Sequence, residues 1–167
     1  MKSHKHPSQR VGIFVDASNM YFATQNIYKA NLNYKNVLQT AVAGRQLVRA
    51  FAYVIETEAN KERDFFTALT DLGYETRIKP LQIFQGGAKK GDWDVGLTID
   101  VVRLLPLLDT VILVSGDGDY IDLIDYLRGH GRRTEVMAFK KNTSSRLIEE
   151  VDEFIDMAED PKRYLIR

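Results

Sequence analysis

The 167-residue sequence contains no cysteine and only three histidines. The lack of cysteine excludes a disulfide framework, a zinc site built on thiolates and a cysteine nucleophile. No apolar run approaches the roughly 18 residues that are needed to span a bilayer. Residues 1–7 also lack the apolar core of a secretory signal. We therefore expect no membrane segment and a cytoplasmic location.

Net charge is lacking as well, because 23 lysines and arginines balance 23 aspartates and glutamates. This balance argues against the broad basic field of a protein that coats duplex nucleic acid. It does not exclude a nuclease, whose acidic metal site can lie beside local basic patches. The content of 44% hydrophobic and 28% charged residues is ordinary for a globular protein, so function must be sought in the placement of residues.

Short apolar runs alternate with amphipathic segments along the chain. Residues 1–9 are polar and are predicted to form a disordered tail, and residues 10–167 are predicted to form a single domain. We expect strands at residues 11–15, 47–55, 74–79, 110–114 and 134–139. Helices are expected between them, at residues 34–43, 58–72, 93–105 and 120–128, with one before residue 34 and a last one from residue 143 or 144 to about 157.

This alternation predicts a three-layer α/β/α sandwich, with a central parallel sheet and helices on both of its faces. The sheet is expected to have five strands in the order 3-2-1-4-5, an order that is assumed from the fold class rather than read from the spacing. In such sheets, ligands bind beyond the carboxyl ends of the strands, where the strand order reverses.

Aspartates follow the two most apolar strands. Asp16 comes directly after the first strand, and Asp117 and Asp119 come directly after the fourth. If those strands are neighbours at the reversal, the three side chains face one another across the crevice. A single Asp after a strand is weak evidence, because Asp favours turns anyway.

A further acidic group lies at the start of the helix at residues 93–105. A carboxylate in the first helical turn is favoured by the macrodipole, so capping alone explains Asp92. Asp94 begins the face that it shares with Thr98, and it can point toward the crevice. Asp100 points roughly a third of a turn away, at about 100° per residue. It is therefore either a supporting partner behind the site or a polar residue at the helix edge.

Several carboxylates brought together raise one another's pKa, and a divalent cation removes this unfavourable interaction. Oxygen donors without cysteine, and without histidine in these motifs, suit Mg²⁺ or Mn²⁺ rather than zinc. Bound at an acidic cluster, such an ion can activate a water and stabilise the leaving oxyanion of a phosphodiester. The pattern therefore indicates a metal site with hydrolytic chemistry.

Three segments carry a resemblance to a known family. They are VGIFVDASNMY at residues 11–21, KGDWDV at residues 90–95 and VSGDGDY at residues 114–120. In this order they strongly resemble the LabA-like NYN domains of the PIN-like nuclease superfamily, over residues 10–157. The resemblance implies a PIN-like sandwich, Mg²⁺ or Mn²⁺ as cofactor, and ribonuclease activity on RNA. The family's acidic positions correspond here to Asp16, Asp94, Asp117 and Asp119.

Four polar residues are candidates for substrate binding. Asn19 matches the family's polar residue after the first strand, and it either holds Asp16 or caps the next helix. Ser115 could bond a metal-bound water, although Ser before Gly-Asp is also ordinary turn chemistry. Lys90 could contact a phosphate as a point charge, and Ser144 could do so at a helix start. A solvated lysine and a helix cap explain these two equally well.

Two aromatic residues could stack on bases, as aromatics in single-strand channels do. These are Tyr21 and Trp93, although a lone Trp beside an apolar helix is more typical of a core. Tyr120 stands where the family commonly has Phe, which we interpret as a mild change.

We predict a metal-dependent ribonuclease acting on single-stranded or structured RNA. Asp16, Asp94 and Asp117 would ligate the metal, and Asp119 would be a further ligand or orient the water. One alternative is an RNA- or protein-binding regulatory module of the same fold. A second is a Mg²⁺-dependent phosphatase, which is disfavoured because Ser18 stands where its acidic catalyst would be. Association with a protein partner, or into a homo-oligomer, stays open.

Overall fold

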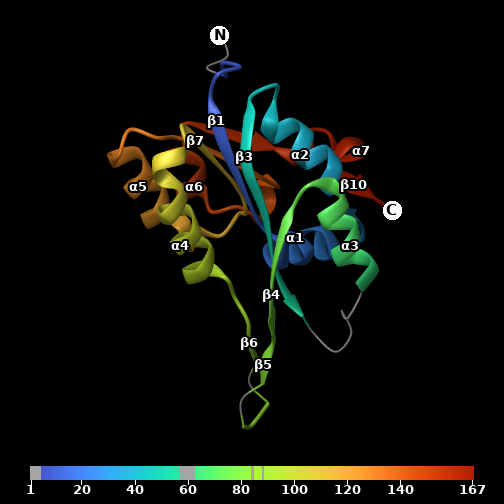
Figure 1. The fold of residues 1–167 in the computed structure, drawn as a ribbon. Helices are drawn as coiled ribbons and strands as arrows, with labels where there is room; N and C mark the ends of the chain where they lie inside the picture. The colour runs from blue at the N-terminus through green and yellow to red at the C-terminus, as the bar shows by residue number, and fades with distance from the viewer. Residues whose placement is uncertain (1–4, 57–62, 84, 88) are drawn as a thin grey trace.

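A parallel sheet of six strands forms the middle layer of the protein (Figure 1). The computed structural model describes residues 5–56, 63–83, 85–87 and 89–167, and only the backbone of residues 63, 89 and 90. The strands, in spatial order, are β4 (Glu75–Pro80), β3 (Gln46–Glu56), β1 (Arg10–Asp16), β7 (Thr110–Val114), β8 (Arg133–Ala138) and β9 (Glu153–Asp156).

Helices cover both faces of this sheet (Figure 1). On one side lie α1 (Ala17–Ala23), α2 (Tyr34–Val42) and α3 (Arg63–Leu72). On the other side lie α4 (Asp94–Leu104), α5 (Ile121–Gly129) and α6 (Ser145–Glu150). The predicted three-layer α/β/α sandwich with a central parallel sheet is therefore confirmed. The predicted helix at residues 58–72 corresponds to α3 from Arg63 to Leu72, and its predicted start at residues 58–62 lies outside the described residues.

The sheet has one strand more than the predicted five. The order 3-2-1-4-5 corresponds to β4-β3-β1-β7-β8, as observed, but β9 pairs parallel with β8 from Glu135↔Glu153 to Ala138↔Asp156. The prediction that the final helix continues to about residue 157 is wrong. This helix ends at Glu150, because the Asp152 carboxylate accepts hydrogen bonds from the Thr134 N–H (2.8 Å) and hydroxyl (3.0 Å) and so ties the chain to β8.

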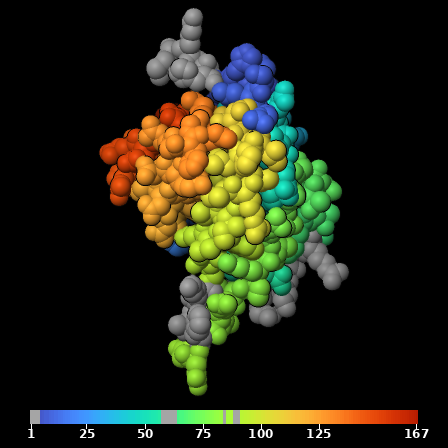
Figure 2. Space-filling model, turned by 60° about the vertical axis from the view of Figure 1, so that its left-hand side comes forward, coloured from blue at the N-terminus to red at the C-terminus, as the bar shows by residue number. Residues whose placement is uncertain are grey.

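Short elements complete the fold. One antiparallel pair joins β2 (Asn31–Leu32) to β10 (Leu165–Ile166). The other joins β5 (Gln82–Ile83) to β6 (Lys89–Lys90) in a hairpin that projects below the sheet (Figures 1 and 2). The remaining helices of the described residues are the π-helix η1 (Thr24–Tyr28), the 3₁₀ helices η3 (Leu105–Leu107), η4 (Gly118–Tyr120), η5 (Lys140–Asn142) and η6 (Met157–Glu159), and α7 (Pro161–Tyr164).

The core is continuous across the centre of the sheet. Every residue of β1 after Arg10 is buried, as is expected for a central strand that is covered on both faces. Phe14 of β1 and Phe51 of β3 are stacked with their ring centroids 5.5 Å apart. The two central strands β1 and β7 are thus fixed by packing on both sides, which makes their carboxyl ends a rigid base for polar groups.

The N-terminal segment contacts this core where the structure describes it. The ammonium of Lys5 lies 2.8 Å from a carboxylate oxygen of Glu153, and the Gln9 side chain accepts a hydrogen bond from Arg45 (3.2 Å). Residues 1–4 lie outside the described residues, and the disorder of the segment at residues 1–9 stays a prediction. Among the described helices, none is long and apolar enough to cross a membrane.

A buried ion pair joins the turn before β3 to β8. The Arg45 guanidinium donates to both Glu135 carboxylate oxygens, at 2.8 and 3.0 Å, and both side chains are fully buried. Arg49 makes a pair of similar geometry with Glu75, at 2.7 and 2.6 Å, but that pair is exposed to solvent. The two pairs therefore differ in burial, and Glu135 also accepts a hydrogen bond from Arg133 Nε at 2.9 Å.

Arg45→Met is expected to lower the free energy of unfolding by about 3–5 kcal/mol, because it leaves the Glu135 charge buried without its main partner. Arg49→Met should lower it by about 1 kcal/mol or less, since water replaces the lost partner. Arg45→Met/Glu135→Leu should recover much of the loss, because neither charge remains. Urea unfolding measures all three variants, and equal losses for Arg45→Met and Arg49→Met would contradict the argument.

Candidate metal centre

The adjacent strands β1 and β7 end beside each other and bring the first two polar segments together. Val15 is the register partner of Val114, so Asp16 and Ser115 leave the sheet at the same level. The Ser115 hydroxyl donates to Asp16 Oδ2 at 3.3 Å. Asp16 also caps α1 by accepting the Asn19 N–H at 3.3 Å, and it is only 5% exposed.

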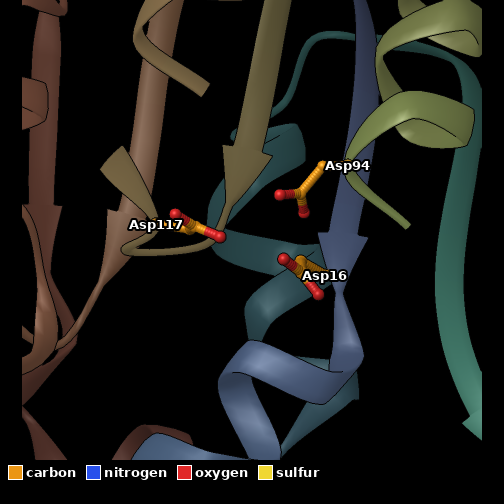
Figure 3. A group of neighbouring side chains, drawn as sticks. All are labelled: Asp16, Asp94 and Asp117. Carbon is orange, nitrogen blue, oxygen red and sulfur yellow. The ribbon is translucent and has the colours of Figure 1, made fainter. Parts of the chain in front are cut away.

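Three carboxylates converge at this point, as Figure 3 shows. Asp16 comes from the end of β1, Asp117 from the loop after β7, and Asp94 from the first residue of α4. One carboxylate oxygen of each lies within 4.8 Å of the others. Within the part of the chain that the structure describes, no other group of three carboxylate, histidine or cysteine side chains has this spacing.

The electrostatics of the three residues favour a bound cation. Burial raises the pKa of Asp16 to about 6, although hydrogen bonds from Asn19, Tyr120 and Ser115 oppose the shift. Partial burial, and then the charge of Asp117, raise the pKa of Asp94. Both shifts indicate that negative charge is unfavourable here without a counter-ion. An all-oxygen donor set that is partly open to solvent fits a hard divalent ion such as Mg²⁺ or Mn²⁺.

Hydrogen bonds fix the loop that carries Asp117. The Gly116 N–H donates to Asn19 Oδ1 at 3.0 Å, and the Asp117 N–H donates to the Ser115 hydroxyl at 3.2 Å. Gly116 also packs so closely against Asn142 that a Cβ would overlap the Asn142 carbonyl oxygen. Asn19 therefore holds the loop after β7, while Asp16 provides the helix cap.

The other predicted site residues lie around this group. Asp119 is exposed and outside the group of three, and its N–H donates to Asp117 Oδ1 at 2.9 Å. Ser144 caps α6 by accepting the Leu147 N–H at 3.4 Å, and its own N–H donates to the Gly116 carbonyl at 2.9 Å. The side chain of Lys90 lies outside the described residues.

Asp100 makes its contacts on the side of β3 and β4. Its carboxylate accepts a hydrogen bond from the Tyr53 hydroxyl at 2.9 Å and lies 3.4 Å from Arg77 Nε. Trp93 also faces β3, because its indole N–H donates to the Val54 carbonyl at 2.9 Å and its ring packs 5.5 Å from that of Tyr53. Trp93 thus has the core role that the sequence also allowed.

Tyr120 is the residue that sequence reasoning undervalued. Its ring is buried, and its hydroxyl donates to Asp16 Oδ2 at 3.2 Å. Its hydroxyl therefore supports the Asp16 carboxylate from a buried position. The available signal was the hydroxyl itself, which a Phe at this position would lack.

The NYN domain model matches residues 10–158. The chain belongs to the NYN domain family. It is 28% identical to the low amplitude and bright protein LabA of Synechococcus elongatus, over 89% of this chain and 83% of that protein. A crystal structure of a protein of unknown function from Vibrio parahaemolyticus superposes with a TM-score of 0.85 at 32% identity, covering 99% of this chain and all of the other. The resemblance to LabA-like NYN domains is thereby confirmed.

In the NYN domain, Asp16→Asn should remove a buried charge and keep one oxygen that can accept the Asn19 N–H. The amide NH₂ then faces the Ser115 and Tyr120 hydroxyls, whose oxygens can accept from it. The folded-state pKa of Asp16 is about 6 against an ordinary 3.8. Its ionisation therefore destabilises the fold fully above about pH 6 and not at all below about pH 3.8. At pH 7, without metal, we expect the variant to be more stable than the wild type by about 1–3 kcal/mol.

Thermal or urea unfolding at pH 7 and at pH 4 measures this difference, which should shrink toward the lower pH. Addition of Mn²⁺ should raise the melting temperature of the wild type more than that of the variant, because the variant has lost a ligand. A variant that is less stable than the wild type at pH 7 without metal would show that the Asp16 charge does not destabilise the fold.

Proposed function

We propose that this NYN domain is a ribonuclease that cleaves phosphodiester bonds of RNA with a divalent cation, Mg²⁺ or Mn²⁺. The observation that carries the proposal is the convergence of Asp16, Asp94 and Asp117, whose carboxylate oxygens lie within 4.8 Å of one another. The family supports it, because the PIN-like fold places acidic residues at this edge of the sheet. Single-stranded or locally open RNA is the favoured substrate, since the scissile phosphate must enter a crevice between strands and helix.

Each residue has a role that follows from its position. Asp16, Asp94 and Asp117 would hold the cation, which when bound polarises the phosphodiester and lowers the pKa of a water. Asp119, exposed beside them, would complete the ligand set or orient the attacking water. Ser115 and Tyr120 keep the Asp16 carboxylate in place by hydrogen bonds of 3.3 and 3.2 Å.

Access to the centre is asymmetric. Asp16 is buried, whereas Asp94 and Asp117 are partly exposed. A phosphate can therefore reach the partly exposed Asp94 and Asp117 more directly than the buried Asp16.

Asp117→Asn is expected to reduce RNA cleavage by about 100-fold or more. Loss even of groups that only support a metal ligand reduces activity about 10–100-fold, so loss of a ligand belongs at or above the upper end of that range. Asp122→Asn is the matched control, because Asp122 is an exposed aspartate in the first turn of α5. It should cleave like the wild type. The assay follows labelled single-stranded RNA with Mg²⁺ or Mn²⁺, and EDTA should abolish cleavage.

Cleavage that survives EDTA, or that Asp117→Asn performs at full rate, would overturn the proposal. RNA binding without turnover, indifferent to metal, would favour a binding module instead. Hydrolysis of p-nitrophenyl phosphate that is lost in Asp117→Asn would favour a phosphatase.

A further inference from the structure

Two cavities lie on the side of α1 and α3, and the lining of one of them includes residues that directly follow Asp16. This nearer one has a volume of about 290 Å³, and its wall includes Ala17 and Ser18, which directly follow Asp16, and Gly91. The farther one has a volume of about 520 Å³. Three aromatic side chains line both of them, and we term the combined space the aromatic groove; these residues are Tyr21, Tyr34 and Phe65.

The aromatic residues of the groove differ in how firmly they are held. Tyr34 packs edge-to-face against Phe65, with centroids 5.7 Å apart, and against Tyr74 at 5.8 Å, so its ring is fixed on two sides. Tyr21 is 54% exposed. A large aromatic side chain that stays open to solvent beside an apolar cavity offers a ring face to a ligand.

The chemistry of the lining selects a flat and uncharged ligand. Among the residues that the structure describes, no acidic residue lines either cavity, and Lys35 in the farther one is the single charged residue. Thr24, Asn31 and Asn33 add polar groups there. Apolar walls with a few polar groups are typical of small-molecule sites of roughly 300–1,000 Å³. Aromatic rings of this kind stack on nucleobases regardless of sequence.

We propose that the aromatic groove binds bases of single-stranded nucleic acid that flank the scissile phosphate. The inference rests on the proposed function, and the continuity of the two sites carries it. Because Ala17 and Ser18 adjoin Asp16, a base in the nearer cavity belongs to a nucleotide next to the one whose phosphate lies at the carboxylates. Bases paired in a duplex cannot enter the groove, so it selects unpaired strands.

Fluorescence anisotropy with a labelled oligouridylate of about ten nucleotides tests this proposal. All proteins carry Asp117→Asn, so that no strand is cleaved during the measurement. Tyr21→Ala should weaken binding about tenfold, which corresponds to the loss of one stacked base. Tyr21→Phe should bind like the parent, because the ring remains. Tyr126→Ala, which removes a 43% exposed tyrosine of α5 outside the groove, should also bind like the parent.

A second probe distinguishes binding of the bases from binding of the sugar-phosphate backbone. An abasic oligonucleotide with the same sugar-phosphate chain should bind more weakly than oligouridylate to the parent, and Tyr21→Ala should not weaken it further. Equal affinity of the two probes for the parent, or equal effects of Tyr21→Ala and Tyr126→Ala, would overturn the proposal. Self-association that is lost in Tyr21→Ala while RNA affinity is unchanged would assign the groove to a second copy of the chain, and would also overturn it.

The outcome is independent of the test of cleavage. Base-dependent binding through Tyr21 in a protein that cleaves no RNA would leave the groove in place and refute the nuclease. Cleavage by the wild type together with unchanged binding by Tyr21→Ala would support the nuclease and refute the role of the groove.

Discussion

Repulsion among three closely spaced carboxylates is the constraint around which this protein is organised. A flexible chain would relieve it by moving Asp16, Asp94 and Asp117 apart. Here Asp16 stands at the end of a fully buried central strand and accepts hydrogen bonds from Ser115 and Tyr120. The packing of β1 and β7 therefore maintains an arrangement of charges that is unfavourable without a counter-ion.

Much of this arrangement could be predicted because it follows from local pattern. Parallel strands that are buried on both faces have unbroken apolar sequences. The apolar runs at residues 11–15 and 110–114 therefore predicted β1 and β7. The position of their polar continuations then placed Asp16 and Asp117 at one sheet edge. Asp94 could be included because it begins the helix face that it shares with Thr98, and because it matches an acidic position of the family.

The features that were missed depend on tertiary contacts. The strand β9 has only four residues, of which the first and last are charged, and it pairs because Asp152 bonds to Thr134 across the sheet. The role of Tyr120 depends on a hydroxyl that reaches Asp16 from a separate segment. On α4, the apolar residues Val95 and Ile99 form a stripe by sequence, yet they are 70% and 45% exposed. Periodicity alone does not tell which of two apolar stripes meets the sheet.

The three carboxylates are positioned by different kinds of structural element. Asp16 and Asp117 extend from paired neighbouring strands, whereas Asp94 follows the β5–β6 hairpin that leaves the sheet altogether (Figure 1). Surface excursions of this kind accept insertions and deletions more readily than sheet strands do. Changes in the length of this hairpin can therefore alter how Asp94 is positioned without altering the pairing of β1 with β7.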